Sequence, residues 1–283
     1  MSFRDPRTVL KTHGLWTKKQ FGQNFLVDAL VVERIVSVSG ALPNDSAIEI
    51  GAGCGTLTSM IAPNVGTLTA LEYDRDLMPV VRSELSGHPN VTIKEMNVLD
   101  VDWQSEAHNA GQPLMLFGNL PYHLSSEIIL ALMESHGAWR RACFMVQKEF
   151  GERLAAPAGT RQSSSLSVQL QLIACTSVAF YVPPQSFTPP PKVDSCVIVI
   201  EPKAGPGVDI GSKKAFQTIV KALFGQRRKM SRKALKSLHV DVAELLALAN
   251  LDGTRRGETF DLHELGQLAN AFHTLQSQRN TTS

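Results

Sequence analysis

Glu49-Ile50-Gly51-Ala52-Gly53-Cys54-Gly55 continues the apolar run Ala47–Ile50, and this stretch decides the fold. Glycines let the backbone turn sharply and approach a ligand closely, because no Cβ stands in the way. Dinucleotide enzymes also place glycines after their first strand, but with the spacing G-x-G-x-x-G. Here the spacing is G-x-G-x-G, and Glu49 precedes the first glycine by two positions. A carboxylate there suits the ammonium of S-adenosylmethionine better than a pyrophosphate, although this turn alone leaves NAD as an alternative.

Apolar runs of strand length alternate with helical patterns through the first 200 residues. The expected strands are Ala47–Ile50, Leu68–Glu72, Val91–Ile93, Leu114–Phe117, Cys143–Gln147 and Cys196–Ile200. Helical spacing occurs in Leu57–Ala62, Leu77–Leu85 and Glu127–Glu134. This alternation predicts an α/β fold with a mostly parallel, doubly wound, Rossmann-like sheet, which the glycine turn and Glu49 favour as a class I methyltransferase sheet. In such sheets ligands bind beyond the carboxyl ends of the strands.

A Pro/Gly-rich stretch at residues 201–207 has the composition of a linker. The expected helices beyond it are Ala215–Phe224, Lys229–Leu238, Val242–Asn250 and His263–Leu275. We therefore expect an S-adenosylmethionine-binding catalytic domain over residues 1–201 and a small, all-helical RNA-binding domain over residues 208–283.

Composition excludes several classes of protein. No apolar run approaches the length of a membrane span, and the first residues lack the apolar stretch of a secretory signal. The four cysteines form no C-x-x-C pair and no cluster with histidine at metal spacing. These features predict a cytoplasmic enzyme that holds no metal.

Two acceptors after later strands complete the expected cofactor site. Glu72 ends the second strand, where a carboxylate can accept hydrogen bonds from both ribose hydroxyls; the alternative is that it merely ends the strand. Asn97 follows the third strand, where its amide oxygen can accept from the cofactor adenine. The cofactor-binding candidates in this part of the chain are Glu49, Gly51, Gly53, Gly55, Glu72, Tyr73, Asn97, Val98 and Asn119.

The fourth strand ends in Gly118-Asn119-Leu120-Pro121-Tyr122, which predicts chemistry on an adenine amino group. That nitrogen is a poor nucleophile, because its lone pair is delocalised into the ring. Accepting both of its hydrogens, at the Asn119 side-chain oxygen and the Leu120 carbonyl, favours a pyramidal nitrogen. Pro121 biases Leu120 away from helix, and Tyr122 can stack on the base. No general base is required, because the amine proton becomes acidic once the methyl carbon is attached.

Phe187 begins the stiff, proline-rich run that leads into the last strand. We expect its ring to face Tyr122 and to sandwich the base, so Phe187 joins the catalytic candidates. The alternative is a proline-rich ligand for another protein, but a run between two sheet elements is poorly exposed.

Basic residues gather in two zones on a chain whose net charge is only +2. From Lys213 to Val240 there is no acidic residue, and the N-terminus carries Arg4, Arg7, Lys11, Lys18 and Lys19. The RNA-binding candidates are Lys221, Arg227, Arg228, Lys229 and Arg232. A solvated helix face explains many such runs, but phosphate contacts are favoured beside a base-modifying site.

Taken together, these segments resemble the ribosomal RNA adenine dimethyltransferases that act on the small subunit, the KsgA-type group. The motifs that carry the resemblance are Lys19–Leu26, Gly51–Gly55, Asn119–Tyr122, Gln147–Glu149, Phe187–Ser195 and Phe224–Lys229. The resemblance implies four methyl transfers to the N6 atoms of two adjacent adenosines in a hairpin near the 3′ end of 16S rRNA. It also implies that Gln23, Asn24, Phe25 and Leu26 border the cofactor, and that a monomer acts on an assembling small subunit.

Three positions depart from the family's pattern. Asn97 stands where the family usually has Asp, His123 follows the catalytic Tyr in place of Asn, and residues 163–165 are serines where a Tyr-Gly pair is common. We therefore expect altered recognition of the cofactor adenine and a loop at 161–165 that is mobile or contacts RNA differently. A large-subunit rRNA methyltransferase of the antibiotic-resistance type, an assembly-checkpoint binding protein and a DNA adenine methyltransferase remain alternatives.

Overall fold

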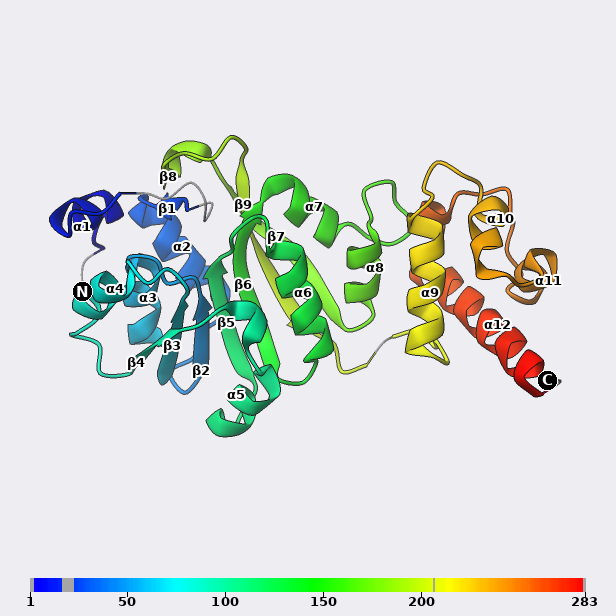
Figure 1. Ribbon diagram of the computed structural model, residues 1–283, viewed down its shortest axis with the longest axis horizontal. Helices are drawn as coiled ribbons and strands as arrows, with labels where there is room; N and C mark the ends of the chain where they lie inside the picture. Colours follow the sequence, from blue (N-terminus) through cyan, green and yellow to red (C-terminus); the bar gives the residue numbers. More distant parts are fainter. Residues whose placement is uncertain (1–2, 17–22, 206, 282–283) are drawn as a thin grey trace. The chain divides into compact units, whose positions relative to one another are not determined.

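The computed structural model describes residues 3–16, 23–205 and 207–281, with side chains as far as residue 278 (Figure 1). The chain divides into two compact units. The first comprises Met1–Gly151 and Thr176–Pro202, and the second comprises Glu152–Cys175 and Lys203–Ser283. The chain leaves the first unit for the last time inside the expected linker. Residues 152–175, expected in the first domain, group with the second unit, because Val168 and Leu172 pack in its core.

The first unit contains the central sheet. Its elements are α1 (Pro6–Thr12), β1 (Phe25–Leu26), α2 (Ala29–Ser39), β2 (Ser46–Ile50), α3 (Thr56–Ile61), η2 (Ala62–Asn64), β3 (Thr67–Glu72), α4 (Met78–Glu84), β4 (Val91–Glu95), η3 (Val98–Asp100), α5 (Trp103–Ala110), β5 (Leu114–Asn119), α6 (Ser125–Glu134), β6 (Trp139–Gln147), η4 (Pro184–Ser186), β8 (Phe187–Thr188) and β9 (Ser195–Pro202). Two elements cross between the units, α7 (Lys148–Ala155) and β7 (Ala174–Val182).

The seven-stranded sheet has the order β4-β3-β2-β5-β6-β9-β7. Neighbouring strands from β4 to β6 run parallel, and β9 runs antiparallel to β6. All six expected strands are present, so the doubly wound α/β sheet is confirmed. The seventh strand, β7, was not expected from the sequence. It lies at an edge of the sheet, and its mixed run of apolar and polar side chains is only partly buried.

Strands such as β5 are buried on both sides, because helices cover the two faces of the sheet. Met115 and Phe117 of β5 point into one apolar cluster with Val32 of α2 and Ile61 of α3. Helix α4 packs through a second cluster against Ala70 of β3. Figure 1 shows α6 lying across the sheet in front of β6. Near-continuous apolar strands are the expected solution for a sheet covered on both faces.

The order of the strands reverses beside β2, and this reversal positions the site. Strand β2 lies between β3 and β5, with Ile50 opposite Gly118. A Cβ on Gly118 would lie 2.8 Å from the Ile50 carbonyl oxygen, so only glycine allows the two chains to approach this closely. Loops that follow β2 and β5 therefore meet at one edge, where ligands bind in open α/β sheets.

The second unit is helical. Besides the second half of α7, its elements are α8 (Ser165–Gln171), α9 (Lys213–Phe224), α10 (Ser231–Ala234), η5 (Leu235–Leu238), α11 (Val242–Leu248), η6 (Gly257–Thr259) and α12 (Leu262–Thr281). Its core contains Phe216, Leu223 and Phe272. In the described part of the chain, no helix is both long and apolar enough to cross a membrane.

Two expectations for the second unit change. The basic stretch is not continuously helical: α9 ends at Phe224, and the expected helix 229–238 begins only at Ser231, because Met230 forms an antiparallel bridge with Arg256. The serine run begins a helix, since Ser164 caps α8 in a reciprocal pair of hydrogen bonds with Ser167.

Candidate active site

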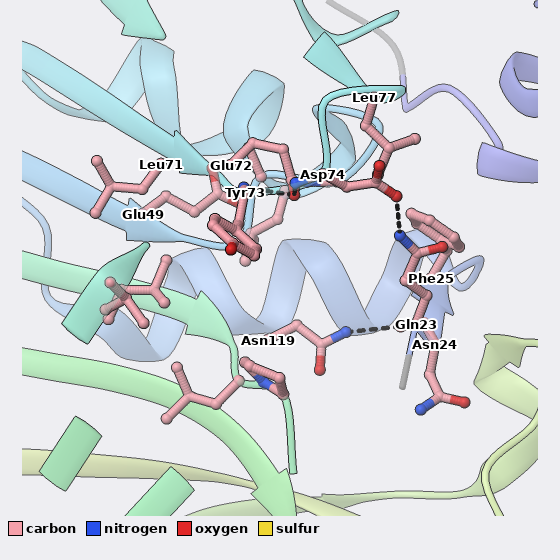
Figure 2. Close-up of a pocket in the computed structure, with 18 of the residues that line it drawn as sticks. Gln23, Asn24, Phe25, Glu49, Leu71, Glu72, Tyr73, Asp74, Leu77 and Asn119 are labelled. Carbon is pink, nitrogen blue, oxygen red and sulfur yellow. Dashed lines mark hydrogen bonds between the residues drawn. The ribbon is translucent and has the colours of Figure 1, made fainter. Parts of the chain in front are cut away.

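A pocket of about 400 Å³ opens at the carboxyl ends of β2, β3, β4 and β5. This volume lies in the usual range for small-molecule sites, about 300–1,000 Å³. The predicted residues that line it are Gln23, Asn24, Phe25, Leu26, Glu49, Gly51, Gly53, Glu72, Tyr73, Asn97, Val98, Asn119, Leu120, Pro121 and Tyr122. Figure 2 shows several of them converging from different elements. Gly55 and Phe187 do not line it.

The glycine turn after β2 is fixed by the next strand. The backbone amides of Gly51 and Ala52 both donate to the Leu71 carbonyl oxygen, at 2.9 Å each. Gly53 has φ +57°, and a Cβ there would lie 3.1 Å from the Phe25 ring. The turn is therefore a cradle that a larger residue would strain and partly fill.

Glu72 ties the glycine turn to the loop after β3. Its carboxylate accepts hydrogen bonds from the backbone amides of Gly53 at 2.7 Å, Tyr73 at 2.8 Å and Asp74 at 2.7 Å (Figure 2). Burial raises the pKa of this carboxyl, and the three amides oppose that rise. Glu72 thus does more than end a strand, and its predicted role with the ribose remains a prediction.

Glu49 is the most unusual group in the pocket. Its residue is 1% exposed, and its Oε2 atom has no hydrogen-bond partner among the described residues. Burial raises the pKa of Glu49 to about 8; interaction with Thr58 opposes this rise, and repulsion from Glu72 adds to it. A buried carboxylate oxygen without a hydrogen bond is costly, and a cation beside the carboxylate offsets that cost. This site fits the ammonium group that the sequence predicted for it.

Asp74 belongs to the pocket but was not predicted. It is 5% exposed, and its carboxylate accepts a hydrogen bond from Gln23 Nε2 at 2.8 Å. This bond links the loop after β3 to the segment that enters β1 (Figure 2). The signal available in the sequence was a second acidic side chain two positions after Glu72.

Asn119 is oriented by the N-terminal segment. Its Nδ2 donates to the Asn24 carbonyl oxygen at 2.8 Å (Figure 2). Because a carbonyl only accepts, the amide group of Asn119 has one allowed orientation, and its Oδ1 remains available as an acceptor. The two residues lie far apart in the sequence, so sequence reasoning could not identify this contact.

Tyr122 is half-buried, and its hydroxyl lies 2.6 Å from the Ser195 hydroxyl. Ser195 is fully buried at the start of β9, opposite Gln147 of β6. Burial raises the pKa of Tyr122, so the phenol stays neutral at physiological pH. In the sequence Ser195 is recognisable only as the end of the motif Phe187–Ser195, and its contact with Tyr122 is a finding of the structure.

Three predicted residues have different surroundings from those expected. Phe187 is 3% exposed and packs in the apolar cluster with Leu26, so its ring does not face the pocket with Tyr122. Gly55 does not line the pocket; it precedes α3, with φ +79°. The Asn97 oxygen accepts from the Leu99 amide at 3.1 Å and caps η3, which uses one of the two lone pairs of the acceptor expected for adenine.

The predicted RNA-binding residues all lie in the second unit. Lys221, Arg228, Lys229 and Arg232 are exposed. Arg227 is half-buried: its Nη2 donates to the Arg161 carbonyl at 2.6 Å, and its Nε lies 3.9 Å from the buried Glu258 carboxylate. Arg227 therefore has a packing role that its place in a basic run did not predict. Lys18, Lys19 and the Lys19–Gly22 part of the N-terminal motif lie outside the described residues.

Within the described ranges, no group of three or more His, Cys, Asp or Glu side chains is arranged to hold a metal ion. Cys54, Cys143 and Cys196 are buried, Cys175 is exposed, and all four are free thiols.

The chain is similar to known proteins over most of its length. The family model described as "Ribosomal RNA adenine dimethylase" matches residues 14–273. The "Ribosomal RNA small subunit methyltransferase A" of Magnetococcus marinus is 40% identical over 93% of this chain and 95% of its own length. The protein of the same name from Geobacter sulfurreducens is 38% identical over 92% and 96%.

Solved structures show the same fold. The 23S rRNA methyltransferase ErmE aligns with a TM-score of 0.71 and 23% identity, over 88% of this chain and 100% of its own. A dimethyladenosine transferase from Plasmodium falciparum aligns with a TM-score of 0.73 and 20% identity, over 89% and 98%.

Proposed function

The chain belongs to the ribosomal RNA adenine dimethylase family, and from this premise we propose that it dimethylates the N6 amino groups of two adjacent adenosines in small-subunit rRNA. The target is the hairpin near the 3′ end of 16S rRNA, and the methyl donor is S-adenosylmethionine. The names of the curated relatives favour the small-subunit substrate over the large-subunit alternative. The likeness to ErmE supports the fold alone.

The observation that carries the proposal is the orientation of Asn119. Its amide nitrogen is engaged by the Asn24 carbonyl, so its oxygen is the atom that can accept from a substrate. An amino group is such a donor, and a carbonyl in the same place is not. A pocket that presents an acceptor here favours an exocyclic amino group, such as that of adenine, over an exocyclic carbonyl oxygen.

The pocket fits the proposed cofactor through two features of this chain. The unpartnered Glu49 oxygen suits an ammonium, and the cradle at Gly51 and Gly53 leaves room for a ligand close to the backbone. Glu72 and Asn97 are proposed to hold the ribose and the adenine. When bound, S-adenosylmethionine supplies a methyl group on a positively charged sulfur.

The residues around the amino group act by position and electrostatics. Asn119 accepts one hydrogen of the adenine amine, and the Leu120 carbonyl is proposed to accept the other. Tyr122 stacks on the base as a neutral phenol, since its hydroxyl is engaged by Ser195. No side chain is needed as a base, because the proton leaves after the methyl group is attached.

We further propose that the enzyme acts as a monomer in the cytoplasm, on a small subunit that is still assembling. Exposed cations of the second unit, including Lys221 and Arg228, contact phosphates and orient the RNA. The extruded adenosine and the shape of the hairpin provide specificity.

The test is methyl transfer from labelled S-adenosylmethionine to purified small and large subunits from a strain that lacks this methylation, followed by nucleoside analysis. Dimethyladenosine in small subunits alone is expected. Labelling of large subunits alone supports the antibiotic-resistance type. Binding to small subunits without any transfer supports a checkpoint protein.

A further inference from the structure

Trp16 is the most exposed large apolar side chain in the described part of the chain, at 87%. The other two tryptophans, Trp103 and Trp139, are 3% and 2% exposed. Tryptophan has the largest apolar surface of any side chain, and leaving it in water forgoes a corresponding stabilisation. An indole held in solvent is available to a binding partner, and tryptophan is enriched at interfaces.

The backbone around Trp16 is anchored, although its side chain is not. Val9 and Leu10 of α1 are buried in a cluster with Phe25, and Leu15 packs against the same cluster. The Leu15 amide donates to the Leu10 carbonyl at 2.9 Å, which folds the chain back at the end of the helix. Trp16 follows directly, so its indole projects from a fixed support.

The same support is held against α4 by charge. Arg4 Nη1 lies 2.6 Å from Glu84 Oε2, and His13 Nε2 lies 3.8 Å from the other oxygen of that carboxylate. Pro6, the first residue of α1, lines the cofactor pocket. The helix that precedes Trp16 therefore begins at the cofactor pocket.

Cations accompany the indole. Arg7 and Lys11 are exposed and lie four residues apart, on the same face of α1. Asp5 is paired with Arg7 and Glu84 with Arg4. Lys11 adds a further exposed positive charge. An exposed aromatic ring among cations is the combination that binds single-stranded nucleic acid.

We propose that Trp16 stacks on an unpaired base of the substrate rRNA, while Lys11 contacts the adjoining phosphate. This inference rests on the proposed function and adds a contact surface in the first unit to the basic residues of the second. Stacking accounts for affinity, and it is independent of the identity of the base.

Kinetics on unmethylated small subunits test the stacking. Trp16→Ala is expected to raise KM for small subunits about tenfold, within the range that base–aromatic stacking gives, with kcat and cofactor affinity unchanged. Trp16→Phe keeps a stacking ring and is expected to remain within about threefold of wild type. Leu42→Ala removes an apolar side chain that is 57% exposed, outside the pocket, and is the matched control without effect.

Salt dependence separates the two contacts. Lys11→Gln is expected to lower the slope of log affinity against log salt by about 0.8, whereas Trp16→Ala leaves that slope unchanged. A photo-crosslinker, p-benzoylphenylalanine, placed at position 16 is expected to label rRNA, and the same group at position 42 is not.

Three outcomes overturn the inference: Trp16→Ala with wild-type KM, Trp16→Phe as impaired as Trp16→Ala, or crosslinks confined to ribosomal protein or a second copy of the chain. Failure of the proposed function is distinguishable, because wild-type protein then does not methylate small subunits. Normal methylation with an unaffected Trp16→Ala variant removes only this inference.

Discussion

The pocket of the first unit and the basic turn of the second unit (residues 221–232) were both predicted from residue types, but their side chains are held differently in the structure. In the pocket, predicted residues converge, and backbone groups fix them: three amides hold Glu72, and the Asn24 carbonyl holds Asn119. In the basic turn, most predicted residues are exposed side chains, and Arg227 instead packs against its own unit.

The difference follows from what each pattern determines. Parallel strands bring their carboxyl ends to one edge, so a residue just after a strand has a defined place whatever its neighbours are. A run of cations determines only that charge lies on a surface. The pocket should therefore respond sharply to small changes, and the basic turn should respond weakly and in proportion to charge.

The largest expected effect is at Asn119. Asn119→Ala removes the acceptor for the amine and is expected to lower kcat by about 10²–10³, with binding of small subunits near wild type. Asn119→Asp keeps the oxygens but loses the donor to Asn24, so it should also be severely impaired. Methyl transfer and subunit co-sedimentation measure the two properties. A parallel loss of binding would contradict the separation of the two regions.

Glu49→Gln tests the buried carboxyl through pH. The native pKa of about 8 exceeds the ordinary value of 4.5, so the cofactor-free protein retains a proton that the unfolded chain releases. The contribution of Glu49 to the free energy of unfolding therefore falls as pH rises from about 4.5 to about 8, and Glu49→Gln should flatten that decline. Thermal unfolding at several pH values measures it.

The same carboxyl should govern cofactor affinity. An ammonium ligand favours ionised Glu49, so affinity should rise by up to tenfold per pH unit below about 8 and then level off. Glu49→Gln should bind about 100-fold more weakly, because an uncharged amide replaces the buried partner of a cation. Calorimetry in two buffers would detect the proton released; equal heats in both would exclude the linkage.

A moderate effect is expected where Ser195 holds Tyr122. Ser195→Ala and Tyr122→Phe should each lower kcat about tenfold, and the double variant should be no worse than either, because both remove one shared hydrogen bond. With three tyrosines in the chain, fluorotyrosine NMR should show only the Tyr122 signal shifting in Ser195→Ala. Additive losses would indicate separate roles.

The smallest effects belong to the basic turn. Arg228→Ala should weaken RNA binding several-fold and reduce the salt slope by about 1, without altering stability. Arg227→Ala should instead lower the free energy of unfolding by about 1–3 kcal/mol, because it leaves the buried Glu258 without its cation. Filter binding at several salt concentrations and urea unfolding distinguish the two variants. Weaker RNA binding in Arg227→Ala together with lower stability in Arg228→Ala would contradict these different roles.

How far the sequence predicts this molecule depends on the same distinction. The six expected strands are present, and most of the residues predicted after β2 to β5 line one pocket, because hydrophobic periodicity and strand order determine their places. Strand β7 was missed because an edge strand carries a weaker apolar pattern. Phe187 and Asn97 reached other surroundings through a short antiparallel pair and a helix cap. Asp74 and Ser195 depend on tertiary contacts that no local pattern encodes.

The contact between Asn24 and Asn119 has a consequence for how this enzyme tolerates change. The group that holds the catalytic amide is a backbone carbonyl, which every residue type supplies. Substitution at position 24 should therefore leave that bond intact. Because Asn24 directly precedes β1, a shift in the register of β1 against β8, where Phe25 pairs with Thr188, would displace the carbonyl. At this point the constraint acts on strand register, and substitution libraries would not reveal it.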